Sequence, residues 1–342
     1  MVLELLKKAQ LGEHLSADEA FTAFREIMNG EVTNPVLIAA LLTAMQMNGP
    51  TATEVTGAAR AMRGAGIKVK APANAVDIVG TGGDGFGTFN VSTTAALIAA
   101  GAGVTIAKHG NKASTSKSGS ADCLAALGYD LMHSIEDVER SIAENGIGFC
   151  FANRCHPAMM YAAPVRKALP YRTIFNLLGP LTNPADVKRH ALGVYAPEII
   201  PIYIAALKAL GAERALVFCG EVPAADGSVK YLDELSLAGV SHVSILREDG
   251  YVLETTVDPV KLFGAARGIE AIQGGTPEEN AALTLAVLKG ERKDAYRDAA
   301  ALNAAAAIVA GGLAETLEEG LKLAYASIDT GKALEKLRGL VG

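Results

Sequence analysis

Two consecutive units, each a short apolar run, a loop of small polar residues and an alanine-rich segment, occupy residues 76–122. In the first unit the apolar run Val76–Val79 precedes the loop Gly80–Thr88. Such an order predicts a strand, a loop and a helix that together bind an anion. Glycine lets the backbone approach a phosphate, and the free N–H groups at a helix start favour negative charge. Ser92 and Thr93 stand where the N-cap of that helix is expected.

The second unit is predicted to have the same plan. Val104–Ala107 is expected to be a strand, Lys108–Gly119 a loop and Ser120–Leu127 a helix. This loop adds lysine cations to the small polar residues. If the two strands are parallel neighbours, both loops leave the same carboxyl edge of the sheet, where a single polyanion could contact both.

Two better-known phosphate motifs fit these loops poorly. Gly80, Gly82 and Gly85 have the spacing of a dinucleotide-binding loop, but the acidic residue expected about 20 positions later is missing, because the next strand leads into Lys108. No Gly-Lys-Ser or Gly-Lys-Thr follows the glycines, as a nucleoside-triphosphate loop requires. Asp84 would repel a phosphate unless it bonds a sugar hydroxyl, a backbone amide or a metal-bound water. These residue types suit a ribose that carries phosphates, with Mg²⁺ nearby.

Three long stretches carry a resemblance to a known family: Asp77–Asp84, Lys108–Asp122 and Arg172–Pro184. Together they resemble the anthranilate phosphoribosyltransferases of tryptophan biosynthesis, and the similarity runs from about Glu19 to Leu337. The resemblance implies transfer of the 5-phosphoribosyl group from phosphoribosyl pyrophosphate to the amine of anthranilate. The products would be N-(5-phosphoribosyl)anthranilate and pyrophosphate, and the implied cofactor is Mg²⁺.

Residues 1 to about 70 are predicted to be helical throughout. Apolar residues recur at spacings of three and four in three segments, Ala17–Met28, Asn34–Met47 and Ala52–Arg63. Ser16 and Glu19 form a capping-box pattern, and Pro35 suits a first helical turn. Apolar positions lie on several faces of these helices, more than one small core needs. We therefore expect a homodimer through this helical region.

Strands alternate with helices in the rest of the chain. Further strands are predicted at Ile147–Ala152, Leu192–Ala196 and Ala215–Cys219, and a hairpin at Val243–Leu246 with Tyr251–Thr256. This alternation indicates a mostly parallel central sheet flanked by helices, with an antiparallel edge. The chain is predicted to be helical again from Thr276, with a break at Gly311–Gly312. The expected fold is α/β, of the nucleoside phosphorylase and phosphoribosyltransferase type. A small all-helical domain, residues 1–70 joined by helices from about 160–185, precedes a catalytic domain of residues 71–342.

Size and charge limit the other possibilities. At 342 residues, half of them apolar, the chain can bury a large core. Its net charge of −6 offers no basic face for nucleic acid, so any cationic site must be local. No apolar run reaches the roughly 18 residues that span a membrane, and Met1–Lys8 is amphipathic rather than a signal peptide, so we expect a cytoplasmic protein. The four cysteines lack paired metal-binding spacings, which favours reduced, buried thiols.

The resemblance assigns most polar residues of the two loops to phosphoribosyl pyrophosphate. These are Gly80, Gly83, Asp84, Thr88, Asn90, Ser92, Thr93, Lys108, Asn111, Ser114, Thr115, Ser116 and Ser120. Breaking the bond from ribose C1 to pyrophosphate places negative charge on the leaving group, which cations and loop amides would stabilise. The expected catalytic residues are Lys108 and Asp84 of this set, together with Arg166.

The acceptor residues implied by the resemblance are Gly80, His109, Asn111, His156 and Arg166. Taken alone, His156 before a proline is more often a loop or capping histidine, and Arg166 a solvated helical charge. As an acceptor residue, Arg166 suits a planar carboxylate, because its guanidinium can donate two parallel N–H bonds. No side chain is expected to act as an essential general base, because an aromatic amine is already unprotonated near neutral pH.

Asp233 and Glu234 are the expected metal ligands. Alone, an adjacent pair of carboxylates is usually solvated surface. This pair follows the predicted strand Ala215–Cys219, at the edge where sheets of this class bind ligands, and Mg²⁺ commonly binds one or two carboxylates together with substrate phosphates. The resemblance gives them this role and adds Ser92 as a further metal contact.

The sequence also departs from the family pattern, and alternatives stay open. Cys155 stands where a second histidine is common, Pro170–Tyr171 replaces a glycine-containing pair, Lys112 replaces a frequent arginine, and Glu221–Tyr231 is a longer loop than usual. A pyrimidine nucleoside phosphorylase shares the expected fold, but its lysine- and histidine-containing phosphate motif is absent before the glycines. A nucleic-acid-binding relative would need a basic cleft and no Asp-Glu pair.

Overall fold

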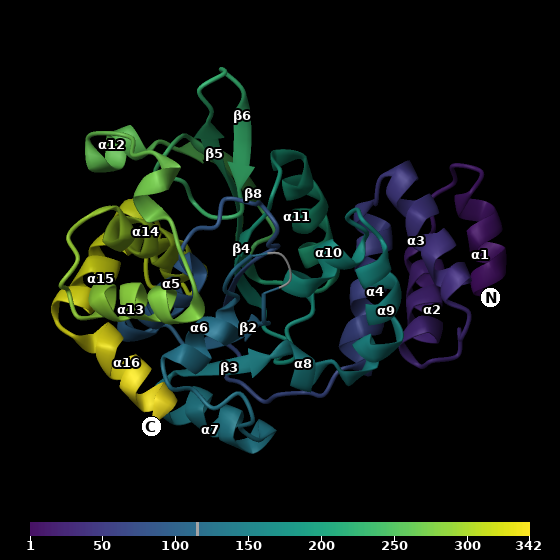
Figure 1. The fold of residues 1–342 in the computed structure, drawn as a ribbon, viewed down its shortest axis with the longest axis horizontal. Coiled ribbons are helices and arrows are strands. Elements are labelled where there is room, and N and C mark those ends of the chain that lie inside the picture. Colours follow the sequence, from purple (N-terminus) through teal and green to yellow (C-terminus); the bar gives the residue numbers. More distant parts are fainter. Residues whose placement is uncertain (114–115) are drawn as a thin grey trace.

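The computed structural model describes residues 1–113 and 116–342. Figure 1 shows the N-terminal helices at one end of an elongated molecule, the C-terminal helices at the other and a twisted sheet between them. A small helical domain thus precedes a large α/β domain whose sheet is mostly parallel and flanked by helices, which confirms the predicted fold class. Within the described residues, no helix is long and apolar enough to cross a membrane.

Four helices begin the chain: α1 (Val2–Ala9), α2 (Ala17–Met28), α3 (Pro35–Asn48) and α4 (Ala52–Ala65). The predicted capping box is present at α2, where Ser16 accepts a hydrogen bond from the Glu19 N–H and the Glu19 carboxylate accepts one from Ser16 N–H. Pro35 occupies the first turn of α3, as predicted. Local capping chemistry therefore sets the helix starts here, as the sequence indicates.

Later segments complete the core of the helical domain. They are the 3₁₀ turn Pro157–Tyr161, α9 (Ala163–Ala168), α10 (Phe175–Leu178) and the 3₁₀ turn Gly179–Leu181. The short helix α8 (Ala152–Cys155) precedes them, and its Cys155 packs in a separate buried cluster with Val69 and Val187. Phe24 of α2 and Phe175 of α10 pack edge to face, with ring centroids 5.2 Å apart. The same buried cluster continues into Leu192 and Val217 of the sheet. The helical domain is thus joined to the sheet by a continuous apolar core.

The sheet has eight strands: β1 (Val76–Gly80), β2 (Ile106–Gly110), β3 (Ile147–Phe151), β4 (Arg189–Gly193), β5 (Arg214–Pro223), β6 (Val229–Leu232), β7 (Ser241–Leu246) and β8 (Val252–Val257). Their order is β3-β2-β1-β4-β5-β7-β8, with β6 beside β5. The strands from β3 to β5 in that order pair in parallel, and β6, β7 and β8 pair antiparallel. The predicted antiparallel edge is confirmed.

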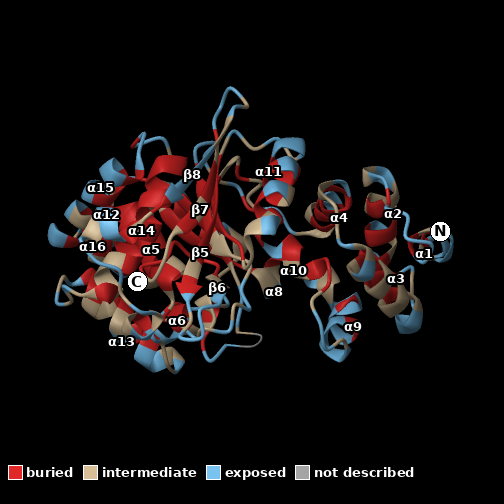
Figure 2. Ribbon diagram, turned by 90° about the horizontal axis from the view of Figure 1, so that it is seen from above, coloured by how far each residue is buried: buried red, intermediate tan, exposed pale blue. Residues whose placement is uncertain are grey.

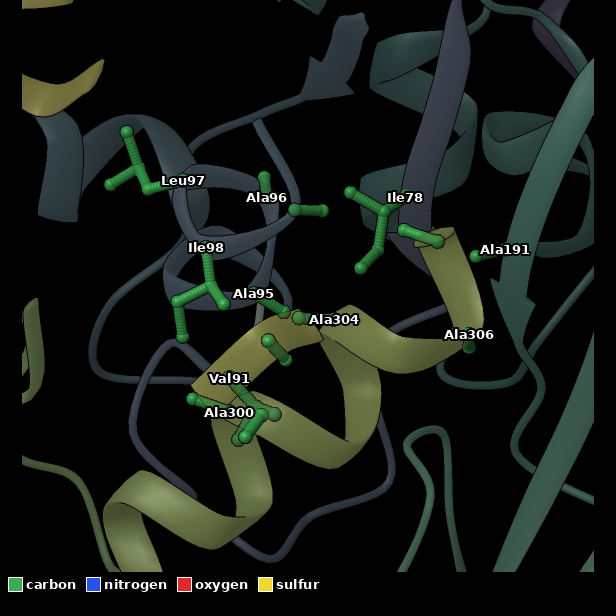
Figure 3. Packing of buried hydrophobic residues seen from close by; sticks show 14 of the residues in the cluster. Ile78, Val91, Ala95, Ala96, Leu97, Ile98, Ala191, Ala300, Ala304 and Ala306 are labelled. Atoms are coloured by element: carbon green, nitrogen blue, oxygen red, sulfur yellow. The ribbon is translucent and has the colours of Figure 1, made fainter. Parts of the chain in front are cut away.

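Helices cover both faces of the sheet. They are α5 (Val91–Gly101), α6 (Ser120–Ala126), α7 (Ile135–Asn145), α11 (Ile200–Ala209), α12 (Pro259–Phe263), α13 (Pro277–Leu288), α14 (Ala295–Ala310), α15 (Leu317–Asp329) and α16 (Lys332–Val341), with 3₁₀ turns at Pro197–Ile199 and Ile269–Ile272. Alanines of α5 and α14, such as Ala95 and Ala304, meet beside Ile78 of β1 (Figure 3). Small side chains let these helices pack closely, and Figure 2 shows both helices almost wholly buried.

Four local predictions are wrong. The N-cap of α5 is Asn90, not Ser92 or Thr93. The second strand begins at Ile106, so Lys108 belongs to β2 rather than to the loop. The fourth strand is β4, which begins at Arg189 instead of Leu192 and ends at Gly193. Much of the predicted loop Glu221–Tyr231 forms the antiparallel hairpin of β5 and β6. Two of these strands contain polar residues that bond to distant parts of the chain: Lys108 of β2 donates to the Ile78 carbonyl, and Arg189 of β4 donates to the Gly311 carbonyl.

Candidate functional site

The predicted loops meet at the carboxyl edge of the parallel strands, where β1 and β2 separate. β1 pairs with β4 at every position from Val76 to Gly80, whereas its pairing with β2 is limited to Val76 and Ile106. Two side chains bridge the gap that follows. Lys108 Nζ donates to the Ile78 carbonyl at 2.7 Å, and the His109 N–H donates to Asp77 Oδ1 at 2.9 Å. The two strands therefore separate before the two predicted loops begin.

Asp233 and Glu234 follow β6 and lie against this edge. Asp233 Oδ2 accepts a hydrogen bond from the Gly82 N–H at 2.6 Å, and Glu234 Oε1 accepts one from the Ser92 N–H at 3.1 Å. A Cβ at Gly80 would overlap the Asp233 carboxylate, so glycine is needed there for the close approach. Both carboxylates are at most 9% exposed. They are part of the site rather than solvated surface.

The charges of these carboxylates are poorly balanced within the protein. The pKa of Asp233 is raised to about 8, mainly by burial and secondly by the charge of the nearby Asp84 carboxylate. Burial and then the charge of Asp233 raise the pKa of Glu234 well above its ordinary value, while Lys108 acts in the opposite direction. A bound cation would favour the ionised forms of both groups.

This donor set fits Mg²⁺ as a shared ligand. Among the described residues, no three His, Cys, Asp or Glu side chains gather closely enough to hold an ion by themselves. Mg²⁺ is typically held by one or two carboxylates, with waters and substrate phosphates completing its octahedral shell. Asp233 and Glu234 supply that minimal set. Ser92 contacts this carboxylate pair through its backbone N–H, which donates a hydrogen bond to Glu234.

The first loop has the backbone that its glycines predict. Gly82, Gly83 and Gly85 have φ angles of 74°, 75° and 83°, in the left-handed region that favours glycine. Asp84 Oδ1 accepts a hydrogen bond from the Phe86 N–H at 3.1 Å. Arg172 donates to the Gly83 carbonyl from outside the loop. The glycine backbone of this loop is therefore held by only a few hydrogen bonds.

The two loops are joined to each other through Asn90. Its side-chain Oδ1 accepts a hydrogen bond from Ser118 Oγ at 3.1 Å, and its Nδ2 donates to the Ser118 carbonyl at 3.3 Å. Ser120 Oγ donates to the Asn111 carbonyl at 3.2 Å, which closes the second loop on itself. Asn111 and Ser116 are exposed, and Thr88 pairs with Gln273 in an isolated bridge. Ser114 and Thr115 lie outside the described residues.

Lys108 and Thr93 lie beneath the loops rather than in them. Lys108 is 3% exposed and Thr93 is 1% exposed. Burial lowers the pKa of Lys108, while the Asp77 and Glu234 carboxylates oppose that shift. Burial also raises the pKa of Asp77 to about 6. The predicted loop cation is therefore a buried one that faces the carboxylates from within the sheet.

Two histidines of the predicted acceptor site come together. The rings of His109 and His156 meet edge to face with centroids 5.1 Å apart, and His109 Nδ1 lies 3.2 Å from the Gly179 carbonyl. Burial lowers the pKa of His109 to about 3 and that of His156 to about 4. Both rings are therefore neutral at pH 7. The Nε2 atom of each is buried without a hydrogen-bond partner among the described residues.

Arg166 stands apart from these histidines. It lies on the exposed side of α9, in the helical domain, with its guanidinium 5.3 Å from the centroid of the Phe175 ring. In the described part of the chain, no hydrogen bond joins Arg166 to His109, His156 or Asn111. The structure brings the two histidines together but does not join Arg166 to them.

Three residues that contact the site or its loops were missing from the prediction: Asp77, Arg172 and Tyr195. Asp77 and Arg172 open two of the stretches that carry the family resemblance, which was the available signal. The guanidinium of Arg172 lies 3.7 Å from the centroid of the Tyr195 ring. Tyr195 follows the end of β4, and nothing in its sequence context marks it.

Comparison with known proteins covers nearly the whole chain. The glycosyl transferase family matches with its helical bundle domain over residues 3–66 and its a/b domain over residues 72–334. The chain is 47% identical over 342 residues to the anthranilate phosphoribosyltransferase of Rubrobacter xylanophilus, covering 100% of this chain and 97% of that protein. These matches favour that enzyme family over the nucleoside phosphorylase and nucleic-acid-binding alternatives.

Solved structures agree. The anthranilate phosphoribosyltransferase of Thermus thermophilus has a TM-score of 0.89 and 45% identity, covering 98% of each chain. The Saccharomyces cerevisiae enzyme in complex with PRPP and Mg has a TM-score of 0.87 and 29% identity, covering 99% of this chain and 96% of that one. The same yeast enzyme in complex with 4-fluoroanthranilate has a TM-score of 0.86 and 27% identity, with the same coverage. Because the chain matches enzymes of this name over its whole length in sequence and over nearly its whole length in structure, it belongs to the anthranilate phosphoribosyltransferase family.

Proposed function

We propose that the chain transfers the 5-phosphoribosyl group of phosphoribosyl pyrophosphate to the amine of anthranilate at the carboxyl edge of its sheet. The observation that supports this most is the placement of Asp233 and Glu234. Although they are about 140 to 150 positions away along the chain, these carboxylates accept hydrogen bonds from the Gly82 N–H of the first loop and from the Ser92 N–H at the start of α5. Adjacent buried carboxylates beside glycine loops suit a metal-bound diphosphate better than any purely structural role.

The donor half of the site would stabilise the leaving pyrophosphate. Mg²⁺ held by Asp233 and Glu234 would neutralise charge on the diphosphate oxygens. The glycine-loop amides and the hydroxyls of the second loop would donate hydrogen bonds to phosphate oxygens, as donors placed where charge develops. Lys108 would contribute a buried positive charge behind this site rather than a direct loop contact, since its ammonium is bonded to Ile78. The yeast relative in complex with PRPP and Mg supports this assignment.

The acceptor half would orient the amine. Arg166 would bind the anthranilate carboxylate, and His109, His156, Asn111 and Gly80 would shape the rest of the pocket. The neutral histidines suit hydrogen bonding and packing better than proton abstraction, because a good general base has a pKa near the working pH. The yeast relative in complex with 4-fluoroanthranilate supports an aromatic amino acid as the acceptor.

The test of the reaction is pyrophosphate release from phosphoribosyl pyrophosphate with a panel of acceptors in the presence of Mg²⁺. Release that depends on anthranilate, with N-(5-phosphoribosyl)anthranilate as the product, is expected. Phosphate-dependent cleavage of pyrimidine nucleosides without pyrophosphate release would contradict the proposal.

Domain limits, assembly and location are further parts of the proposal. Residues 1–70 with helices from about 160–185 would form one domain and residues 71–342 the catalytic one, which the shared core of α2 and α10 supports. The protein would work in the cytoplasm.

A homodimer through the helical domain is proposed from the surface of α3. This helix buries Leu41 and Leu42, yet it also exposes Val36 at 70% and Met47 at 82%. A helix that is apolar on several faces usually has more than one partner. Val36→Glu with Met47→Glu should shift the solution mass from dimer to monomer. A wild-type protein that is strictly monomeric at micromolar concentration would contradict the dimer.

A further inference from the structure

We propose that Arg172 is a positioning residue that fixes the Gly83–Asp84 peptide and so holds the glycine loop ready for the diphosphate of the substrate. The inference rests on the proposed function of this loop. Arg172 would act through the backbone of the loop, without contact to the reacting atoms.

The guanidinium is held between two elements of the fold. Arg172 donates to the Gly83 carbonyl, and its central carbon lies 3.7 Å from the centroid of the Tyr195 ring. A cation stacked on an aromatic ring is attracted by the negative face of the ring. Tyr195 follows β4, which pairs on both sides in the middle of the sheet. The sheet therefore gives the guanidinium a firm platform facing the loop.

The segment that carries Arg172 is also anchored to the helical domain. The Tyr171 hydroxyl lies 2.6 Å from Thr43 Oγ1 of α3. Thr43 uses its own proton to donate to the Ala39 carbonyl at 2.7 Å, so Tyr171 is the donor to Thr43. Contacts on both sides thus restrict the backbone that places Arg172.

The loop needs such a contact because, among the described residues, one hydrogen bond from the Phe86 N–H to Asp84 is all that holds Gly83–Phe86 from within. Gly82, Gly83 and Gly85 all have positive φ, and glycine has the largest conformational freedom to lose on ordering. Asp233 binds the Gly82 N–H, and Gly274 N–H binds the Gly87 carbonyl at 2.8 Å. Between these two points, Arg172 provides the one hydrogen bond from outside to the loop backbone among the described residues.

Fixing this carbonyl has a directional consequence. In a trans peptide the C=O of Gly83 and the N–H of Asp84 point in opposite directions. Arg172 attracts the carbonyl toward Tyr195, so the Asp84 N–H points away from Arg172 and stays free to donate. Without Arg172, the Gly83–Asp84 peptide can rotate and present its carbonyl oxygen in place of the donor. A carbonyl oxygen would repel a phosphate, whereas convergent N–H groups bind it.

Two measurements test this role. The first is hydrogen exchange of the amides in residues 80–88 of the substrate-free enzyme. The second is calorimetric binding of pyrophosphate with Mg²⁺, together with KM values for both substrates. Arg172→Ala should speed exchange in the loop about tenfold and weaken pyrophosphate binding about 10- to 100-fold, the usual range for losing a charged hydrogen bond. The KM for anthranilate should change less than about threefold.

Matched variants separate positioning from direct binding. Tyr195→Leu removes the platform and should reproduce the faster loop exchange, whereas Tyr195→Phe keeps the ring and should retain most of the protection. Arg247→Ala removes an arginine stacked on Tyr251 in the β7–β8 hairpin, 5.9 Å from its ring centroid, and should leave the loop unchanged. Unchanged exchange with lost pyrophosphate binding would show that Arg172 is a direct ligand and overturn the proposal. Failure of the wild-type enzyme to release pyrophosphate would instead reject the proposed function, while the exchange data would still decide the role of Arg172.

Discussion

Two proposed parts of the site are built in different ways: the donor edge, where Asp233, Glu234 and the two loops would bind phosphoribosyl pyrophosphate, and the acceptor pocket of His109, His156 and Arg166. At the donor edge, Asp233 and Glu234 are bonded to the Gly82 and Ser92 amides, and the two loops are joined through Asn90. In the acceptor pocket, His109 and His156 of the sheet side touch each other, but Arg166 lies on an exposed helix of the other domain. The donor edge is therefore assembled by the sheet itself. The acceptor pocket depends on how the helical domain meets the sheet.

The two regions also differ in charge. The donor edge gathers carboxylates whose pKa values are raised by burial and mutual repulsion, whereas burial lowers the pKa of both acceptor histidines and keeps them neutral. A bound cation would stabilise the ionised carboxylates of the first region, whereas the neutral histidines of the second need no counter-ion. This contrast predicts strong metal dependence at one end of the site and weak pH dependence at the other.

The largest effect is expected from Asp233→Ala with Glu234→Ala. This double variant removes the proposed metal ligands, so kcat/KM should fall on the order of 10³-fold and added Mg²⁺ should not restore it. Thermal stability without metal should not fall, because the burial that raises the pKa of both carboxylates makes them unfavourable to folding at neutral pH. Asp226→Ala with Glu254→Ala, two exposed carboxylates in the β5–β6 turn and on β8, serves as the control. Titrating activity with Mg²⁺ checks the prediction, and an unchanged metal requirement would refute the assignment.

Arg166→Ala tests the acceptor pocket. The KM for anthranilate should rise, with a loss of about 2–4 kcal/mol if the charge pair with the substrate carboxylate is desolvated. Binding of phosphoribosyl pyrophosphate should be spared, because Arg166 has no described contact with the donor edge. Lys167→Ala, the exposed neighbour on α9, is the matched control. Steady-state kinetics with each substrate varied in turn give the answer, and equal damage to both substrates would make Arg166 structural.

Local sequence patterns predict some parts of this molecule, whereas contacts between residues far apart in the chain cannot be predicted in this way. The glycine loop, the capping box at Ser16 and the antiparallel edge follow from local patterns, and the structure has all three. Lys108 was expected in a loop because a lysine is rarely placed inside a sheet. Its ammonium bonds the Ile78 carbonyl and faces Glu234, partners 30 and 126 positions away along the chain. Arg172 and Tyr195 likewise meet only through the fold. Contacts of this kind leave no periodic signal in the sequence.

A smaller effect is expected in the pH dependence of stability. Unfolded histidine has a pKa near 6.5, and the folded pKa of His156 is about 4. Between these values the unfolded state binds the proton and the folded state does not, so this histidine's contribution is full above pH 6.5 and is lost as the pH falls. His156→Gln should therefore gain stability relative to wild type by about 1.4 kcal/mol per pH unit between pH 6.5 and 4.

Denaturant unfolding of both proteins without metal at several pH values measures this slope. Titrating groups that do not interact with His156 cancel in the difference between variant and wild type, whereas the adjacent His109, whose pKa the charge of His156 also lowers, contributes to it. His190→Gln is a parallel case outside the acceptor pocket, because burial lowers the pKa of His190 to about 3. Parallel stability curves for His156→Gln and wild type would mean that His156 is not held neutral.

The smallest effect is expected on kcat from His109→Ala. An imidazole whose pKa is lowered to about 3 by burial is a weak base at pH 7, and the amine of anthranilate can attack the developing cation before its proton leaves. The loss in kcat should stay below about tenfold, less than the 10²–10⁴-fold typical of a true acid–base group. The pH profile of kcat should be the same in wild type and variant between pH 6 and 8. A larger loss, together with the disappearance of a kinetic pKa near 6–7, would show that a catalytic histidine exists and that the acceptor pocket is not the neutral region inferred from its burial.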